Sequence, residues 1–336
     1  MEQSPDDATI PGQQDRMRAG RLALVVGVLI FAAKLAAFLT THSTAVLADA
    51  MESTINIVAA ALLVYALSLA SRPPDPGHPY GHGKIEFLSA GIEGAAIAFA
   101  ALVIVAEGIR DLIAGPEIRS LDVGLALLVA STVANAALGF HLVRVGRRAD
   151  SAALEADGRH VLADVWTSLG VLVGLGVVAA TGWVWADPVV AILVGLHVAF
   201  EGYSLVKDAL AGLLDEADPD HIDETAEVLE TARRDAWIDL HGLRSWRSGA
   251  RRHFDLHLTV PRYFDVEQIH RIHDEVGLAL LGEDPHGGDV VVHFDPCDAS
   301  DCPQCALPSC PVRSADFERR PPFTGERAAR TDEVVH

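Results

Sequence analysis

The sequence predicts an all-α membrane bundle of six transmembrane helices, followed by a cytoplasmic α+β domain. Half of the 336 residues are hydrophobic and 21% are charged, whereas soluble domains carry about 25% charged residues. Charge concentrates in the second part, because residues 211–336 hold 26 acidic and 13 basic side chains and nine of the fifteen histidines. An acidic surface repels phosphate backbones, which argues against nucleic acid as a partner.

Six apolar stretches support the membrane part. A helix needs roughly 20 apolar residues to cross the hydrocarbon core, and the stretches cover residues 22–41, 45–70, 87–109, 121–144, 161–182 and 186–208. Their Gly and Ala content allows helices to pack closely. We therefore expect a polar segment at 1–20, without the pattern of a signal peptide, and a transmembrane domain at 21–210.

Basic residues predict the orientation of these spans. Arginines precede the first span. The second connection holds Arg72 and Lys84, and the fourth connection holds several arginines. The odd-numbered connections hold only Arg110 and Arg119. Because positive charge stays on the cytoplasmic side, both termini are expected in the cytoplasm, with the bundle surrounded by inner-membrane lipid.

The pattern changes beyond residue 210. Residues 219–234 and 265–281 have helical spacing, whereas three strands are predicted at 239–247, 254–260 and 289–295. The resulting order αββαβ over 211–297 predicts a small α+β domain. The tail, 298–336, begins with cysteines and has little apolar content after them, so we expect it to be disordered.

Polar residues inside two of the apolar spans are candidate ligands, because ionisable groups there are costly and are usually functional. Asp49, Glu52 and Asn56 fall on one face of the second span, and His160 and Asp164 share a face of the fifth. Two such helices can form a site for Zn²⁺ or another first-row divalent cation. The alternative is that these residues only make hydrogen bonds between helices.

Two further groups of polar residues are less specific. His197 and Glu201 in the sixth span are also four residues apart and could act as ligands or as a proton relay, or could bond a neighbouring helix. The loop residues Asp75, His78 and His82 combine metal-ligating types with Pro and Gly. They could hold Zn²⁺ or form a solvated turn.

The second part is rich in histidine. His257 and His293 lie on the polar faces of their predicted strands, and His293 shares its face with Asp295. Histidines on a surface are often incidental, but their density in this acidic domain predicts metal binding.

Four cysteines follow the last predicted strand. Cys297, Cys302, Cys305 and Cys310 lie within fourteen residues of a part of the chain predicted to be cytosolic. Such a cluster indicates a tetrahedral Zn²⁺ site, and a redox or disulfide role is the alternative.

These motifs resemble those of the cation diffusion facilitator family, which are bacterial divalent metal/proton antiporters, over roughly residues 20–297. The loop PDPGHPYGHGKIE at 74–86 carries part of the resemblance, as does the pair His160-x3-Asp164 followed by TSLGVL. LADAMESTIN occupies the position of a family His-x3-Asp or Asp-x3-Asp pair. The segments HGLR, HLTV and HFDP resemble parts of the family's metallochaperone-like cytoplasmic domain.

The resemblance implies a homodimer that exports metal from the cytoplasm in exchange for protons by alternating access. Lys84 and Asp215 match positions of a charge interlock at the dimer interface. The residues matching the family's binuclear cytoplasmic zinc site are His241, His257, His270, His293 and Asp295.

The chain departs from the family pattern in two respects. Glu52-x3-Asn56 places a neutral amide where the family has a carboxylate, and Asp49 is an alternative fourth ligand. The cysteine cluster is not part of the general pattern. Zn²⁺ is the expected cargo, with iron, cobalt, nickel and manganese as alternatives.

Other classes of protein fit the sequence less well. An intramembrane metalloprotease needs an HExxH motif, which the sequence lacks, so we expect no enzyme. A membrane-anchored metal sensor would not require paired ligands on two spans. A passive channel would be slowed by a tight four-ligand site.

Overall fold

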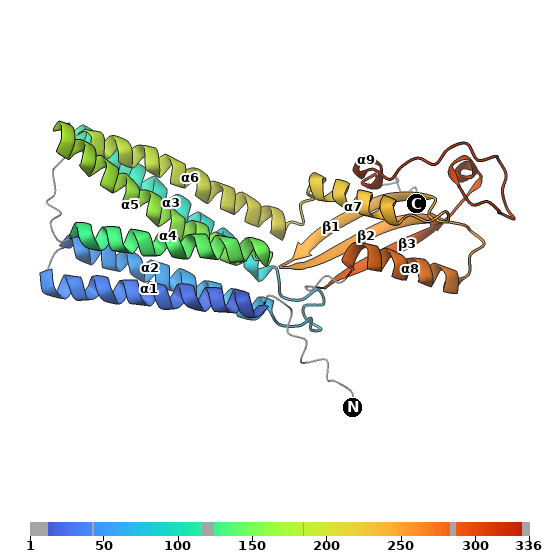
Figure 1. The fold of residues 1–336 in the computed structure, drawn as a ribbon, viewed down its shortest axis with the longest axis horizontal. Coiled ribbons are helices and arrows are strands. Elements are labelled where there is room, and N and C mark those ends of the chain that lie inside the picture. The colour runs from blue at the N-terminus through green and yellow to red at the C-terminus, as the bar shows by residue number, and fades with distance from the viewer. Residues whose placement is uncertain (1–12, 42–43, 116–123, 184, 283–286, 331–336) are drawn as a thin grey trace, which may run out of the picture. The chain divides into compact units, whose positions relative to one another are not determined.

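The computed structural model describes residues 13–41, 44–115, 124–183, 185–282 and 287–330 (Figure 1). The chain divides into two compact units, Met1–Leu214 and Asp215–His336. Each unit has its own packing and is described by itself below.

The first unit consists of long helices, and each of them overlaps one of the apolar stretches. They are α1 (Gln13–Thr41), α2 (Thr44–Ala70), α3 (Ile85–Ala114), α4 (Gly124–Arg148), α5 (Ala152–Thr181) and α6 (Ala186–Leu213).

Some of these helices are long enough to cross a membrane. Within the described residues, three helical stretches are long and apolar enough to cross a membrane, namely Gln13–Ala36, Ile85–Ala114 and Pro188–Leu213. Asn56–Ala70 is a shorter apolar stretch. A membrane helical domain is therefore present, while the six-span topology remains a prediction.

Small residues bring the helices of the first unit together. Helix α3 packs along α6, and α4 packs along α5. A Cβ atom on Gly202 of α6 would lie 2.6 Å from the backbone nitrogen of Ala98 on α3. A Cβ atom on Gly158 of α5 would lie 2.7 Å from the backbone nitrogen of Val143 on α4. These contacts require glycine, as expected for closely packed membrane helices.

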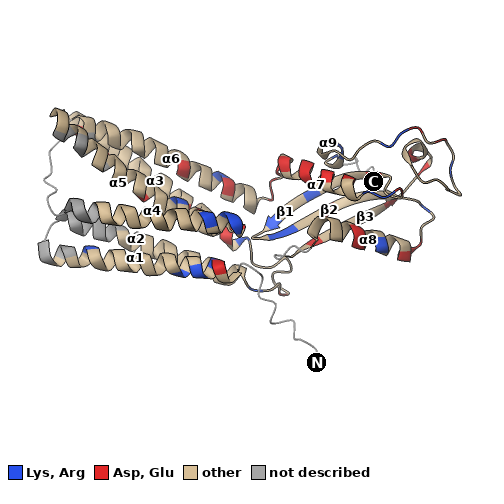
Figure 2. Ribbon diagram, viewed as in Figure 1, with Lys and Arg blue, Asp and Glu red and all other residues tan. Residues whose placement is uncertain are grey.

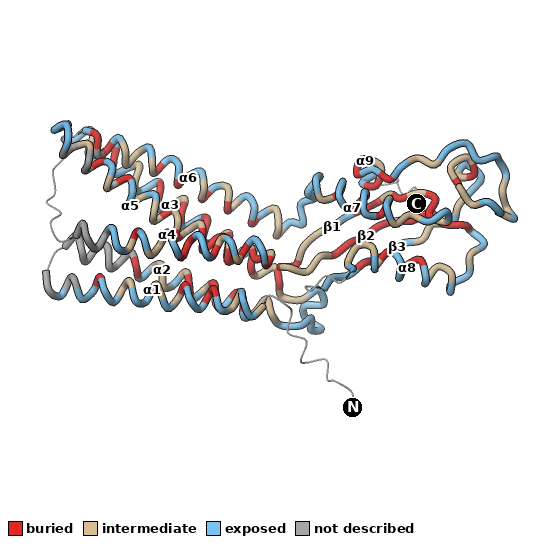
Figure 3. The backbone as a smooth tube through the Cα atoms, in the orientation of Figure 1, coloured by how far each residue is buried: buried red, intermediate tan, exposed pale blue. Residues whose placement is uncertain are grey.

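Buried residues of the bundle alternate with exposed ones along the described helices (Figure 3), and many of the exposed side chains are large and apolar. Large apolar side chains such as Leu29, Phe99, Phe140 and Phe200 are more than half exposed. Charged residues gather mainly at one end of the bundle (Figure 2). Exposed apolar patches of this extent mark a surface that contacts lipid or protein.

A buried ion pair stabilises the start of α3. Glu86 is fully buried, and its carboxylate accepts a hydrogen bond of 2.9 Å from Arg16 on α1. It also accepts a hydrogen bond from the hydroxyl of Ser151, and Arg16 donates to the carbonyl of Ala149. These bonds connect α1 and α3 to the turn before α5 and so help to position the amino end of α5.

The second unit has the predicted order αββαβ. Its elements are α7 (Pro219–Ala232), β1 (Asp239–Ser248), β2 (Arg251–Val260), α8 (Val266–Leu281) and β3 (Gly288–Pro296). The sheet order is β1-β2-β3, in which β1 pairs antiparallel with β2 and β2 pairs parallel with β3.

Alternation along β2 directs one face of this small mixed sheet into the core. Phe254 and Leu256 are at most 2% exposed and pack with Ile222 of α7 and Val276 of α8. Helix α7 starts at a Pro after Asp218, whose side chain accepts a hydrogen bond from the amide of Asp220. This is a typical N-cap, and it explains why the helix begins there.

The tail differs from the predicted disorder. It contains a 3₁₀ helix, η2 (Ala299–Gln304), and a short helix, α9 (Gly325–Ala328). Phe323 is 5% exposed and belongs to the apolar core of the second unit. The guanidinium of Arg233 lies 3.7 Å from the centre of its ring. The prediction is therefore wrong for residues 298–330, because a few well-placed apolar residues attach the tail to the core.

Candidate metal centres

A polar cluster connects α2 with α5. The side-chain amide of Asn56 donates a hydrogen bond of 2.7 Å to Asp164, and its oxygen lies 3.2 Å from Nε2 of His160. A carboxylate can only accept, so the NH₂ group of Asn56 must face Asp164 and its oxygen must face His160. Nε2 of His160 is then the donor, and its buried Nδ1 has no hydrogen-bond partner. The structure thus brings together three of the predicted transport ligands.

The other two candidates on α2 are Asp49 and Glu52. Both lie on this helix, but their side chains are outside the described residues. Glu52 precedes Asn56 by about one helical turn and therefore shares its face.

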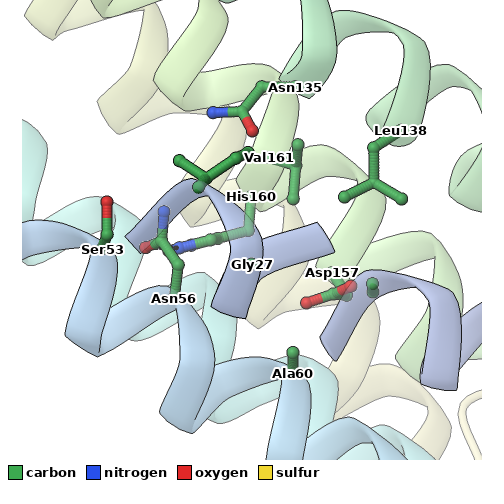
Figure 4. A pocket seen from close by; sticks show the side chains of 11 residues that line it. Gly27, Ser53, Asn56, Ala60, Asn135, Leu138, Asp157, His160 and Val161 are labelled. Atoms are coloured by element: carbon green, nitrogen blue, oxygen red, sulfur yellow. Dashed lines mark hydrogen bonds between the residues drawn. The ribbon is translucent and has the colours of Figure 1, made fainter. Parts of the chain in front are cut away.

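A cavity of about 30 Å³ borders the cluster, which is room for about two water molecules or one cation. Asn56, His160, Ser53, Asn135 and Asp157 supply its polar lining, and Figure 4 shows Asn56 beside the ring of His160. The cavity places solvent-sized space directly at two of the predicted ligands.

Asp157 is a residue that the sequence interpretation missed. It is 2% exposed, and one of its carboxylate oxygens has no hydrogen-bond partner. Residue 157 was assigned to the polar connection between two spans, yet α5 already begins at Ala152. Helical spacing could have found it, because Asp157, His160 and Asp164 are separated by three and four residues and share a face.

Glu93 on α3 is a second acid of this kind. It is 2% exposed, and neither carboxylate oxygen has a hydrogen-bond partner. Asp157 is its electrostatic neighbour. Buried ionisable residues without hydrogen-bond partners are costly in a membrane bundle and are usually functional.

The loop between α2 and α3 forms a second cluster. Ligand atoms of Asp75, His78 and His82 lie within 4.8 Å of one another. Nδ1 of His78 and Nε2 of His82 lie 3.2 and 3.3 Å from the Asp75 carboxylate. Desolvation raises the pKa of Asp75, but hydrogen bonds from His78 and Gly77 outweigh it and hold the pKa below its ordinary value. The carboxylate is therefore ready to bind a cation.

A third cluster lies on the sheet of the second unit. The strand register aligns His241 with His257 and His257 with His293. The carboxylate of Asp295 lies near all three rings. Its oxygens are 3.4 Å from Nε2 of His241, 3.0 Å from Nδ1 of His257 and 3.3 Å from Nε2 of His293. Ligand atoms of His241, His257 and Asp295 lie within 4.8 Å of one another. His270 is separate, because it contacts Asp274 on α8.

All four cysteines are free thiols. They line one cavity beyond the end of β3. Hydrogen bonds from the hydroxyl and amide of Ser314 lower the pKa of the Cys302 thiol. Burial raises the pKa of Cys297.

The remaining candidate residues include His197, Lys84 and Asp215. His197 on α6 contacts Trp166 of α5 edge to face, with ring centroids 5.4 Å apart, which favours a helix-packing role for the pair it forms with Glu201. Lys84 is the N-cap residue of α3, and Asp215 begins the second unit. The charge interlock between Lys84 and Asp215 stays a prediction.

Comparison with known proteins assigns both units. The family model of the cation efflux transmembrane domain matches residues 21–214, and that of the cation efflux protein cytoplasmic domain matches residues 217–297. The chain is similar to an uncharacterized transporter, sll1263, of Synechocystis, at 34% identity over 265 residues, which is 79% of this chain and 85% of that protein.

Two pumps are similar over most of the chain. The cation-efflux pumps FieF of Citrobacter koseri and of Escherichia fergusonii are each 30% identical over 283 residues. The matched regions cover 83% of this chain and 92% of each pump.

Proposed function

This chain belongs to the cation diffusion facilitator family of cation efflux proteins, and from that premise we propose that it exports Zn²⁺ in exchange for protons. As a member of the family it is a multi-pass membrane transporter of divalent cations and not an enzyme. The cluster between α2 and α5 supports zinc as the cargo and protons as the exchanged ion.

The observation that carries the proposal is the direct contact of Asn56 with both His160 and Asp164. Imidazole together with carboxylate favours Zn²⁺ and its first-row neighbours over Ca²⁺ and Mg²⁺, which prefer oxygen ligands alone. With Glu52 as the fourth ligand, the site would carry two formal negative charges and would neutralise one divalent cation. If Asn56 only makes a hydrogen bond between helices, Asp49 is the alternative ligand in its place.

We infer that His160 takes part in proton exchange. Its Nε2 must carry a proton to donate to Asn56, while a metal ligand must present a bare nitrogen. Binding through Nε2 therefore breaks this hydrogen bond and displaces its proton, which must move to Nδ1 or to another acceptor. Asp157 and Glu93 are buried acids. Asp157 interacts electrostatically with His160 and with Glu93, so we propose these two acids as proton acceptors.

We propose six transmembrane spans with both termini in the cytoplasm, in a domain covering 21–210. The exposed apolar side chains of the bundle would contact lipid. The cytoplasmic domain, 211–297, belongs to a dimerisation domain family, and we infer a homodimer with Lys84 and Asp215 at its interface.

The two other clusters have supporting roles in this proposal. The loop residues Asp75, His78 and His82 would take up metal at the membrane surface. The sheet cluster, with His270 as the predicted further ligand, would bind Zn²⁺ in the cytoplasm and stabilise the dimer, since a ligand that binds only the folded assembly stabilises it.

Reconstitution tests the proposal. In proteoliposomes with an acidic lumen, Zn²⁺ should accumulate inside against its own gradient, and a lumenal pH indicator should report alkalinisation at the same time. Dissipating the pH gradient with a protonophore should stop accumulation. Accumulation that is unchanged without a pH gradient would exclude proton exchange, and preferential transport of Fe²⁺, Co²⁺, Ni²⁺ or Mn²⁺ would correct the cargo.

A further inference from the structure

The cysteine cluster lies outside the region that the family accounts for. The match to the cytoplasmic domain ends at residue 297, which is the first of the four cysteines. All four nevertheless line a single cavity, together with Arg262, Asp298, Asp301, Val312 and Arg313. The transport proposal does not use this cavity.

The backbone around the thiols is fixed by local hydrogen bonds. Cys297 follows β3 directly, and its amide donates to the carbonyl of Val260 at the end of β2. Asp298 caps η2 and accepts from the amide and hydroxyl of Ser300, both at 2.6 Å. Asp301 accepts from the amide of Asp298 at 2.8 Å. These two carboxylates stabilise the turn that carries the cysteines.

Arg313 holds the far side of the loop. Its guanidinium donates to the carbonyl oxygens of Cys302, Cys305 and Leu307 at 3.3, 3.2 and 2.6 Å. The backbone amide of Ser314 lies 3.4 Å from Sγ of Cys302 and donates to it. An amide donor to sulfur stabilises the thiolate form, which is the form that binds metal.

The charge of the cavity suits a metal with four thiolates. A Zn²⁺ ion with four cysteine thiolates carries a net charge of about −2, and the cavity is lined by two guanidinium groups, from Arg262 and Arg313. Cys302 and Cys305 are buried, whereas Cys297 and Cys310 are partly exposed. In a filled zinc site the sulfurs lie roughly 3.8 Å apart.

Some side-chain movement is needed to reach that spacing. Among the described residues, the groups with three ligand atoms within 4.8 Å of one another are the loop cluster and the sheet cluster, so no three of the four sulfur atoms lie this close together. Closing the site therefore requires the thiols to change rotamer.

We propose that Cys297, Cys302, Cys305 and Cys310 bind one Zn²⁺ in a tetrahedral thiolate site. Each thiol releases its proton to solvent as the sulfur–zinc bond forms, and no group changes its oxidation state. The bound ion connects the end of β3 to the tail. The tail then continues to Phe323 in the core and to Arg327, which donates to Asp239 at 2.7 Å. The zinc and α9 thus attach the tail at two points.

The test uses the full-length protein, purified in detergent under reducing conditions and loaded with Co²⁺ alone. Wild type should show thiolate-to-cobalt charge-transfer absorption with tetrahedral d–d bands, and Cys302→Ser should lose both. The zinc content of Zn²⁺-loaded protein should fall by about one ion per chain in Cys302→Ser. Ser309→Ala, an exposed change within the same loop, is the matched control and should change neither measurement.

Wild type alone also decides the question if the variant does not fold. A thiol reagent should leave all four cysteines unreacted in the Zn²⁺-loaded protein and should modify them after chelation. Four reactive thiols in the presence of Zn²⁺, cysteines that become reactive only after a reductant is added, or the absence of charge-transfer absorption would each overturn the proposal. Retained Zn²⁺ transport by Cys302→Ser distinguishes this site from the transport cluster.

Discussion

The cluster between α2 and α5 and the cluster on the sheet use the same donors in different surroundings. His160 and Asn56 border a small cavity within the helical bundle, whereas the side chain of His257 is 42% exposed and that of His293 is 66% exposed. The sheet ligands lie on strands whose register is fixed by backbone hydrogen bonds. The membrane ligands come from two helices that are joined by their own side chains.

We propose that this difference assigns different tasks to similar chemistry. Ligands on one sheet keep their spacing, and the sheet cluster would equilibrate with the surrounding solution. Ligands on two helices would separate if the helices move, and the same donors could then bind a metal on one side of the membrane and release it on the other. The comparison predicts that damage to each cluster affects a different measurement.

The largest effect is expected for Asp164→Ala. It removes the carboxylate that accepts the hydrogen bond of Asn56 and one charged ligand of the proposed site. Losing a residue that only supports a metal ligand costs about 10–100-fold in affinity or activity, so loss of the ligand itself should lower Zn²⁺ transport at least about a hundredfold. His257→Ala should retain transport within about threefold and lose zinc bound by the cytoplasmic domain. Zinc uptake and equilibrium dialysis measure the two properties.

Asp208→Ala is the control for Asp164→Ala, because Asp208 is an acid on α6 with a side chain that is 63% exposed. Its transport should equal that of wild type. If Asp164→Ala transports at the wild-type rate, the membrane cluster is not the transport site.

The next effect concerns pH. His160→Asp keeps a ligand but removes the imidazole, the side chain proposed to exchange protons, so zinc uptake should depend less steeply on pH. His197→Gln changes another histidine of the bundle, which packs against Trp166, and should keep the wild-type slope. An unchanged slope in His160→Asp would assign proton coupling to the carboxylates, with Asp157 and Glu93 as the next candidates.

The smallest effect concerns the stability of the cytoplasmic domain. Phe323→Ala in a fragment covering 211–330 should lower the free energy of unfolding by about 2–4 kcal/mol, because a buried aromatic ring is lost. Phe317→Ala also removes a phenyl ring, but from a side chain that is 48% exposed. It should lower the free energy of unfolding by less than about 0.5 kcal/mol. Equal effects in urea titrations would mean that the tail does not pack on this core.

Periodicity accounts for what could be predicted from the sequence. The apolar stretches located the long helices, and alternation in FDLHLTV together with helical spacing predicted the order αββαβ. Spacing of three and four residues also placed Asn56, His160 and Asp164 on faces that meet. These features repeat along the chain, so a local pattern is enough to find them.

The features that were missed depend on single residues or on contacts distant in sequence. Asp157 falls outside the predicted fifth span because the first turns of α5 contain polar residues and so do not read as part of an apolar stretch. The ordered tail rests on Phe323 and Ala328, and two apolar residues make no pattern. His270 is grouped with the sheet ligands by resemblance alone; within one chain it lies near Asp274 of its own helix, and its role as a further ligand stays a prediction.

The central claim is that Asn56 and Asp164 contact the same transported ion. Exchanging the two groups tests it most directly, through Zn²⁺ uptake by Asp164→Asn, Asn56→Asp and the double variant. Asp164→Asn alone should lose transport, and the double variant should regain at least tenfold over it, because the site again holds the same number of carboxylates. If the double variant transports no better than Asp164→Asn, the two residues act independently and the claim is contradicted.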